Sequence, residues 1–193
     1  MQYQKIKLGN NVLKDNAKKL VGIIGFGYWG PNITRNFSNH SKCEVKYICD
    51  LDSNARKRAK NSYPNIKITD NSDIIFTDKE IDIVAIITPV SMHYPLAKKA
   101  LKAGKHIFLE KPMVKTVVQA SDLIKIAKEK KLVGVVDHTF LFTGAVMKIK
   151  EIVDSGEIGD ITYFDSVRVN LGLFQHDVDV IWDLAPHDLS ILF

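Results

Sequence analysis

The chain has 193 residues, of which 46% are hydrophobic and 25% charged, and its formal net charge is +5. This composition is ordinary for a soluble globular protein, and no apolar run is long enough to span a bilayer, which excludes a transmembrane helix and a membrane partner. The positive excess falls largely on expected helix faces without a nucleic-acid-binding motif, so we expect no nucleic-acid partner.

A polar arm, residues 1–19, comes first and lacks the apolar core of a signal peptide. Residues 20–30 follow as an apolar run that ends in Gly-x-Gly-x-x-Gly, and a helical pattern comes next. This order predicts a buried strand, a tight turn and the start of a helix. In such a unit Gly25 permits the turn, Gly27 lets the backbone approach a pyrophosphate, and Gly30 allows close packing of helix on strand.

A second strand, residues 44–49, ends in Asp50, twenty positions after Gly30, where a ribose 2′-hydroxyl needs an acceptor. The combination predicts a dinucleotide site, although a glycine turn that binds nothing is the alternative. The Asp50 carboxylate should repel a 2′-phosphate, which favours NAD over NADP. Arg56, one turn into the next helix, could stack on adenine or meet a phosphate. The dinucleotide contacts expected from this unit are Gly25, Phe26, Gly27, Tyr28, Trp29, Gly30, Asp50 and Arg56.

Strands and helices continue to alternate. Helices are expected over 53–62, 74–76, 95–103 and 116–130, and strands over 66–69, 81–87, 106–109 and 132–136. Because strand 81–87 is almost wholly apolar, as in a sheet covered on both faces, the pattern predicts an α/β fold. We assign residues 20–137 to a Rossmann domain with a doubly wound parallel sheet. Cys43 and Cys49 lie too far apart along one strand to form a disulfide, which suits a cytoplasmic protein.

Ligands of open parallel sheets lie at the carboxyl ends of the strands. Thr88, Pro89 and His93 follow strand 81–87, so we place them in a loop that could touch the cofactor. Capping of the next helix is an equal alternative for His93. Glu110 and Lys111 follow strand 106–109 and belong to the same edge of the sheet.

The sequence pattern changes after residue 137. A helix is expected over 145–153, a strand over 158–170 and a loop over 171–180, followed by the motif region and a final apolar run. These elements predict the beginning of an α+β open-sheet substrate domain. The apolar ending, residues 189–193, suggests a C-terminally truncated chain. A lone strand with an uncovered face should associate or aggregate unless a partner covers it.

The dinucleotide fingerprint, Glu110-Lys111-Pro112 at a strand end, and Asp183 four residues before His187 form a distinctive set. Together they resemble the glucose–fructose oxidoreductase/inositol dehydrogenase/MocA family of NAD(P)-dependent dehydrogenases. Residues 170–172 and 182–189 look most like its branch in bacterial sugar-nucleotide and surface-polysaccharide pathways. The resemblance also implies a homo-oligomer once the second domain is completed.

The resemblance implies a role for each motif residue. Lys111 would lie beside the nicotinamide, and Glu110 would form part of the dinucleotide site. His187 would be the general base, with Asp183 orienting its ring. Pro186 is tolerated only in the first turn of a helix, which would leave Asp183 just outside that helix. The alternatives are a surface lysine, an aspartate that caps the helix and a histidine packed in the core. His138 and His176 have no motif that assigns them a role.

We therefore expect an enzyme that uses NAD to oxidise a ring hydroxyl of a nucleotide-linked sugar, at C3 by resemblance, without a metal. One alternative is a dehydrogenase of a free polyol or sugar such as an inositol. Another is a truncated module that binds dinucleotide but cannot turn over substrate, because its substrate wall is missing.

Overall fold

The computed structural model describes residues 17–168 and 177–192. The described strands are β1 (Lys19–Ile24), β2 (Cys43–Cys49), β3 (Lys67–Thr69), β4 (Ile83–Ile86), β5 (His106–Leu109) and β6 (Gly134–Val136). The helices are α1 (Gly30–Asn39), α2 (Ser53–Ser62), α3 (Asp73–Thr77), α4 (Val90–Lys102), α5 (Val117–Glu129), α6 (Gly144–Ser155) and α7 (Val180–Leu192), with a 3-10 helix η1 (Thr139–Phe142). None of these helices is both long and apolar enough to cross a bilayer.

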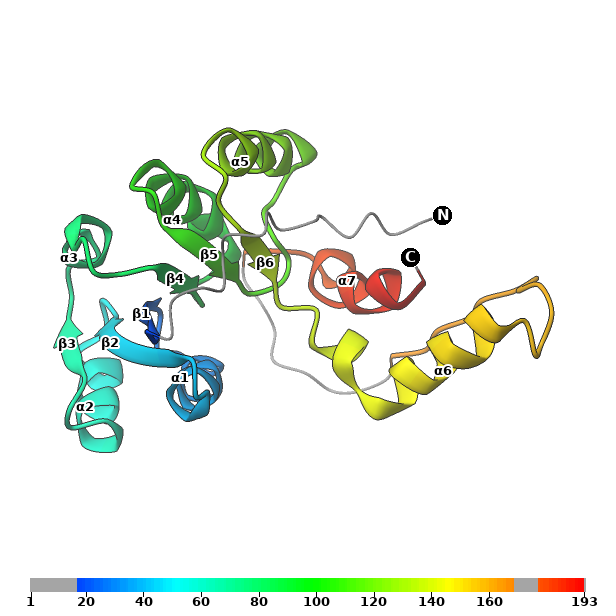
Figure 1. Cartoon of the computed structure of the whole chain (residues 1–193), viewed down its shortest axis with the longest axis horizontal. Helices are drawn as coiled ribbons and strands as arrows, with labels where there is room; N and C mark the ends of the chain where they lie inside the picture. The colour runs from blue at the N-terminus through cyan, green and yellow to red at the C-terminus, as the bar shows by residue number, and fades with distance from the viewer. Residues whose placement is uncertain (1–16, 169–176, 193) are drawn as a thin grey trace.

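The strands pair in parallel in the order β3-β2-β1-β4-β5-β6, which is the doubly wound order of a Rossmann fold. The predicted fold class is confirmed. Figure 1 shows α1 and α2 on one face of the sheet and α3, α4 and α5 on the other, while α6 projects away from it. Along β1, Val21 and Ile23 pack toward the first pair of helices and Ile24 toward the other face. Both faces of the strand are therefore buried.

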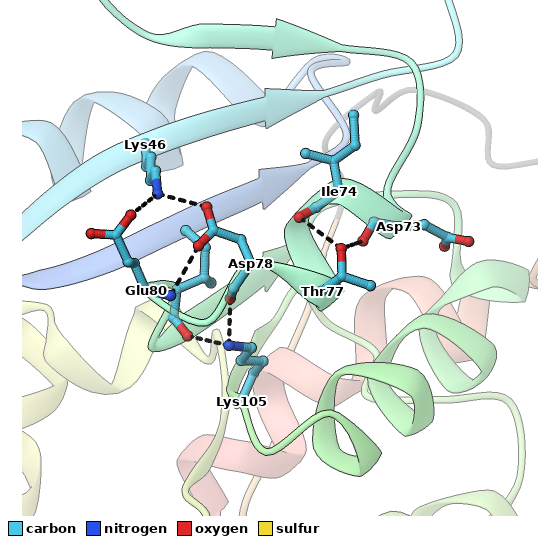
Figure 2. A network of polar contacts seen from close by, with 8 residues as sticks. Lys46, Asp73, Ile74, Thr77, Asp78, Glu80 and Lys105 are labelled. Atoms are coloured by element: carbon cyan, nitrogen blue, oxygen red, sulfur yellow. Dashed lines mark hydrogen bonds and ion pairs between the residues drawn. The ribbon is translucent and has the colours of Figure 1, made fainter.

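A buried lysine joins the beginnings of β4 and β5 (Figure 2). Lys105, only 6% exposed, donates hydrogen bonds of 2.7 Å to the carbonyl oxygens of Asp78 and Ile81. Lys46 of β2 forms ion pairs of 2.6 Å with the carboxylates of Asp78 and Glu80. Burial lowers the pKa of Lys105. The lysine supplies a second donor to the carbonyl oxygen of Asp78, which also accepts a bond from the N–H of Ile81, and the one donor to the carbonyl oxygen of Ile81 among the described residues.

Lys105→Met is expected to lower the free energy of unfolding by about 2–4 kcal/mol, because methionine fills similar space but removes two hydrogen bonds and leaves the buried carbonyl oxygen of Ile81 without its donor. Urea denaturation of the two proteins measures the difference. The control is Lys79→Met at an exposed position in the same connection, where we expect a change within about 0.5 kcal/mol. Equal effects of the two substitutions would contradict this account of Lys105.

Helix α4 begins at Val90, five residues before the expected start at Pro95. The Asp177 carboxylate accepts a 3.0 Å hydrogen bond from the backbone N–H of Ser91 and so satisfies a donor of the first turn. Asp177 lies 86 residues farther along the chain. The expected boundary was wrong because this cap comes from a distant segment that no local pattern indicates.

The strand expected over 158–170 is not formed over its described part, residues 158–168. Ile161 and Val167 are 57% and 72% exposed, and the described residues supply no neighbouring strand for this segment. An alternating sequence becomes a strand only when a partner takes up its backbone hydrogen bonds. Residues 169 and 170 of the prediction, and most of the expected loop over 171–180 with His176, lie outside the described residues.

Helix α7 also begins earlier than expected. The Asp179 carboxylate accepts a 2.8 Å hydrogen bond from the N–H of Trp182, so the helix starts at Val180 and contains both Asp183 and Pro186. The expectation that Pro186 would lie in the first turn, with Asp183 outside the helix, was wrong. Proline at this position has no N–H to donate to the carbonyl one turn earlier, and the helix tolerates that loss.

Candidate active site

The three glycines after β1 differ in what surrounds them. Gly25 has φ +99°, and a Cβ there would clash with the carbonyl oxygen of Ile87. A Cβ on Gly30 would lie 2.9 Å from the carbonyl oxygen of Gly25, whereas one on Gly27 would meet nothing within 4 Å. The first and third glycines therefore serve the turn and the packing of α1 on β1. The second faces open space, as a backbone that approaches a ligand must.

Asp50, at the end of β2, holds the glycine loop. One carboxylate oxygen accepts a 2.5 Å hydrogen bond from the N–H of Phe26, and the other accepts one of 2.8 Å from Asp52. Arg56 donates bonds of 2.9 Å to the carbonyl oxygens of Asp50 and Leu51. Asp50 is thus positioned at the edge of the loop. Arg56 is tied to the turn that follows β2.

A cavity of about 240 Å³ opens where the glycine loop meets the carboxyl ends of β4 and β5 and the start of α7. It is lined by Gly27, Tyr28, Trp29, Ile87, Thr88, Pro89, Val90, Glu110, Lys111, Pro112, Val178 and Asp183. The structure thus brings together eight of the fifteen site residues selected from the sequence. The other seven are not part of this lining: Gly25, Phe26, Gly30, Asp50, Arg56, His93 and His187. Ile87, Val90 and Val178 were missed because apolar walls carry no chemical signature in the sequence.

A larger apolar hollow of about 530 Å³ lies between the segment after β5 and α7. Among the described residues its lining holds His138 and Ser190 but no carboxylate or ammonium group. The smaller cavity is therefore the candidate active site, because it combines the glycine loop with ionisable side chains.

His93 does not occupy a loop. It lies in α4, is fully buried, and its ring nitrogens are 3.0 Å from the carbonyl oxygen of Pro112 and 2.8 Å from that of Thr88. The prediction that it lies in a cofactor loop was wrong, because α4 starts three residues before it. His93 instead connects the two segments that carry Thr88 and Lys111 to the cavity.

Lys111 and Asp183 form an ion pair in the cavity wall. The Lys111 ammonium group lies 2.8 Å from the Asp183 carboxylate and donates a second bond, also 2.8 Å, to the Asp183 carbonyl oxygen. The two side chains are 14% and 20% exposed. The expected contact between Asp183 and His187 is not formed, because α7 aims the Asp183 carboxylate at Lys111. The pair joins the Rossmann domain to α7.

His187 lies beyond this pair, one helical turn after Asp183. Its Nδ1 is buried and has no hydrogen-bond partner among the described residues. The imidazole packs against the ring of Phe140 with 4.7 Å between centroids and 79° between planes. Burial, followed by the positive charges of Lys111 and Arg168, lowers the pKa of His187 to about 4. At neutral pH the ring is therefore uncharged, the form that can accept a proton.

Glu110 shares its surroundings with a second carboxyl group. It accepts a 3.0 Å hydrogen bond from the backbone N–H of Lys111 and is within hydrogen-bonding reach of Asp137, the residue after β6. Burial and the neighbouring Asp137 raise the pKa of Glu110 to about 7. Asp137 was missed, although the rule that placed Glu110, position at the carboxyl end of a strand, applies to it equally.

Glu110 should make the stability of the fold depend on pH. Because its pKa is about 7 in the folded state and 4.5 ordinarily, the folded chain binds more protons between these values, so stability falls as pH rises through this window. Glu110→Gln cannot ionise and should be more stable than the wild type by roughly 1–3 kcal/mol at pH 8 and equal to it at pH 4. Urea denaturation at both pH values tests this, with exposed Glu129→Gln as a control that should show no such difference.

The comparisons with known proteins agree with the Rossmann fold. Residues 19–138 match the GFO/IDH/MocA family, described as an oxidoreductase family with an NAD-binding Rossmann fold. The chain belongs to this oxidoreductase family. Its relatives include the oxidoreductase YdgJ of Escherichia coli (strain K12), which is 30% identical over 190 residues, or 92% of this chain and 53% of YdgJ. This GFO/IDH/MocA chain thus spans about half the length of that relative.

Two other relatives have more specific names. The dTDP-3,4-didehydro-2,6-dideoxy-alpha-D-glucose 3-reductase of Streptomyces violaceoruber is 34% identical over 46% of this chain and 26% of its own length. The scyllo-inositol 2-dehydrogenase (NADP(+)) IolW of Bacillus subtilis is 25% identical over 84% of this chain and 44% of its own length. Among solved structures, an NAD-binding protein from Listeria innocua aligns with a TM-score of 0.78 and 25% identity, over 91% of this chain and 54% of that one.

Proposed function

We propose that this GFO/IDH/MocA oxidoreductase uses NAD to oxidise a ring hydroxyl, at C3, of a sugar nucleotide in the cytoplasmic biosynthesis of surface polysaccharide. The proposal rests mainly on one observation: the glycine loop and the Lys111–Asp183 pair line the same cavity. The similarity to a dTDP-sugar 3-reductase supports the choice of substrate class.

The residues at the cavity fit a dinucleotide. Gly27 has open space where a Cβ would be, and the Asp50 carboxylate lies at the edge of the same loop. The hydroxyl of Thr88, a lining residue, is buried without a partner among the described residues, so it is free to bind a ligand group. When bound, the nicotinamide supplies the hydride acceptor of the reaction.

The side chains of this chain would supply the remaining chemistry. Lys111, held by Asp183, would bind and orient the substrate hydroxyl group. The uncharged ring of His187 would take the proton that the alcohol loses when it becomes a ketone. Residues 138–193 would begin the substrate and oligomerisation domain, and a homo-oligomer would cover the apolar side chains that 158–168 expose.

Calorimetric titration with NADH and then NADPH tests the cofactor assignment. We expect NADH to bind at least about 10-fold more tightly than NADPH, because the Asp50 carboxylate repels a 2′-phosphate. Asp50→Ala should reduce this preference. The exposed variant Asp160→Ala should leave it unchanged. No binding of either nucleotide to the folded chain would contradict the proposal.

A free polyol is the second candidate substrate, because a relative of this chain is a scyllo-inositol dehydrogenase. Thermal shifts distinguish the two classes: stabilisation by UDP or dTDP in the presence of NADH supports a sugar nucleotide, and stabilisation by inositol alone supports a polyol. Reduction of added NAD in the presence of substrate separates either enzyme from a chain that only binds the dinucleotide.

A further inference from the structure

The pairing of Asp183 with Lys111 leaves His187 without the carboxylate expected to orient it. We propose that Phe140 and Arg168 are the positioning residues of His187 and hold its ring in one orientation. This inference rests on the proposed function, in which His187 is the base.

Four side chains, from His187 through Phe140 and Arg168 to Asp188, form a stack that begins and ends on α7. The ring of Phe140, in η1, lies nearly perpendicular to the imidazole of His187. The Arg168 guanidinium carbon lies 4.8 Å from the centroid of Phe140. Arg168 then forms two hydrogen bonds, of 2.6 and 2.9 Å, with the carboxylate of Asp188, the residue next to His187. Phe140 thus contacts both the imidazole and a cation that is itself attached to the helix.

Each contact in this stack restricts the next one. A two-bond fork between guanidinium and carboxylate defines the plane of Arg168, and a cation over an aromatic face favours one placement of Phe140. The Arg168 and Asp188 side chains are 26% and 21% exposed, so solvent screens their ion pair only in part. A perpendicular ring pair then limits rotation of the His187 imidazole. Packing therefore replaces the hydrogen bond that an aspartate would provide.

Most of the charged groups around His187 act in the same direction as its burial. Lys111, Arg168 and His138 disfavour a proton on its ring, and Asp188 favours one. Asp188 is itself paired with Arg168, which lowers the pKa of that carboxyl group. Asp183, on the same helix, is paired with Lys111.

NMR titration of the histidine side chains in the 193-residue chain tests the inference without any measurement of activity. The chain has 6 histidines, and His187→Gln identifies the signal of His187. We expect this ring to remain uncharged down to about pH 5 in the wild type, and its titration midpoint to rise by about one unit or more in Phe140→Leu and Arg168→Gln. Phe140→Tyr, which keeps the ring pair, should preserve the wild-type midpoint.

Phe142→Leu is the matched control, since Phe142 is an aromatic residue of the same 3-10 helix that is 75% exposed. It should leave the signal of His187 unchanged. A midpoint that stays the same in both Phe140→Leu and Arg168→Gln would overturn the inference, as would an ordinary midpoint near 6.5 in the wild type. Arg168→Gln keeps the Phe140 side chain itself, so it provides the test if Phe140→Leu does not fold.

NADH titration of the same proteins separates this inference from the proposed function. Absence of NADH binding in the wild type contradicts the proposed function alone, and the expected midpoints would still support the stack around His187. Normal NADH binding with unchanged midpoints overturns the stack alone.

Discussion

Gly25→Ala is expected to weaken NADH binding by at least about 100-fold and to lower the free energy of unfolding by about 2–4 kcal/mol. Gly25 has φ +99°, and a methyl group there would clash with the backbone of Ile87. That backbone has little freedom to move, because the N–H of Ile87 donates a 2.8 Å bond to Ile24 and the N–H of Gly25 donates one of 2.8 Å to Cys49. Calorimetry and urea denaturation measure the two effects.

Gly27→Ala is the matched control in the same loop. Its Cβ would meet nothing within 4 Å, so folding should be affected by less than about 1 kcal/mol. NADH affinity should nevertheless fall, because the added methyl group faces the place proposed for the pyrophosphate. Wild-type affinity in Gly27→Ala would contradict that placement even if Gly25→Ala behaves as expected.

Lys111→Met should reduce turnover of a supplied substrate by about 1,000-fold or more while leaving NADH affinity within a few-fold of the wild type. The reason is that Lys111 would contact the substrate hydroxyl, whereas the glycine loop and Asp50 would hold the dinucleotide. Absorbance of NADH at increasing substrate concentration measures turnover, and calorimetry measures affinity. Equally severe losses of both would contradict the assigned role of Lys111.

The stability of the same variants provides a test that needs no substrate. Lys111→Met should cost about 3–5 kcal/mol, because it leaves the Asp183 carboxylate largely buried without its cation. A double-mutant cycle with Asp183→Asn should give a coupling energy of about 1–3 kcal/mol. The exposed pair Lys148–Glu151, 62% and 69% exposed, serves as the control and should give less than about 1 kcal/mol. Equal coupling energies in the two pairs would contradict the claim that burial strengthens the Lys111–Asp183 pair.

Local features were predictable where neighbouring residues determine the structure. Gly25, the acidic residue at position 50 and the motif at 110–112 each follow a strand, and parallel strands end at one edge of the sheet. For this reason the sequence alone was sufficient to predict the doubly wound sheet and the meeting of the glycine loop with Glu110 and Lys111.

The partners of individual side chains depended on the tertiary structure. Four-residue spacing suggested that Asp183 would face His187, but the fold pairs Asp183 of α7 with Lys111, two residues after β5. The apolar alternation over 158–168 did not become a strand, because no described segment pairs with it. The sequence by itself determined the elements and the end of the sheet that carries the site. Only the tertiary structure decided which charges pair and which rings pack, because those contacts join segments far apart in the chain.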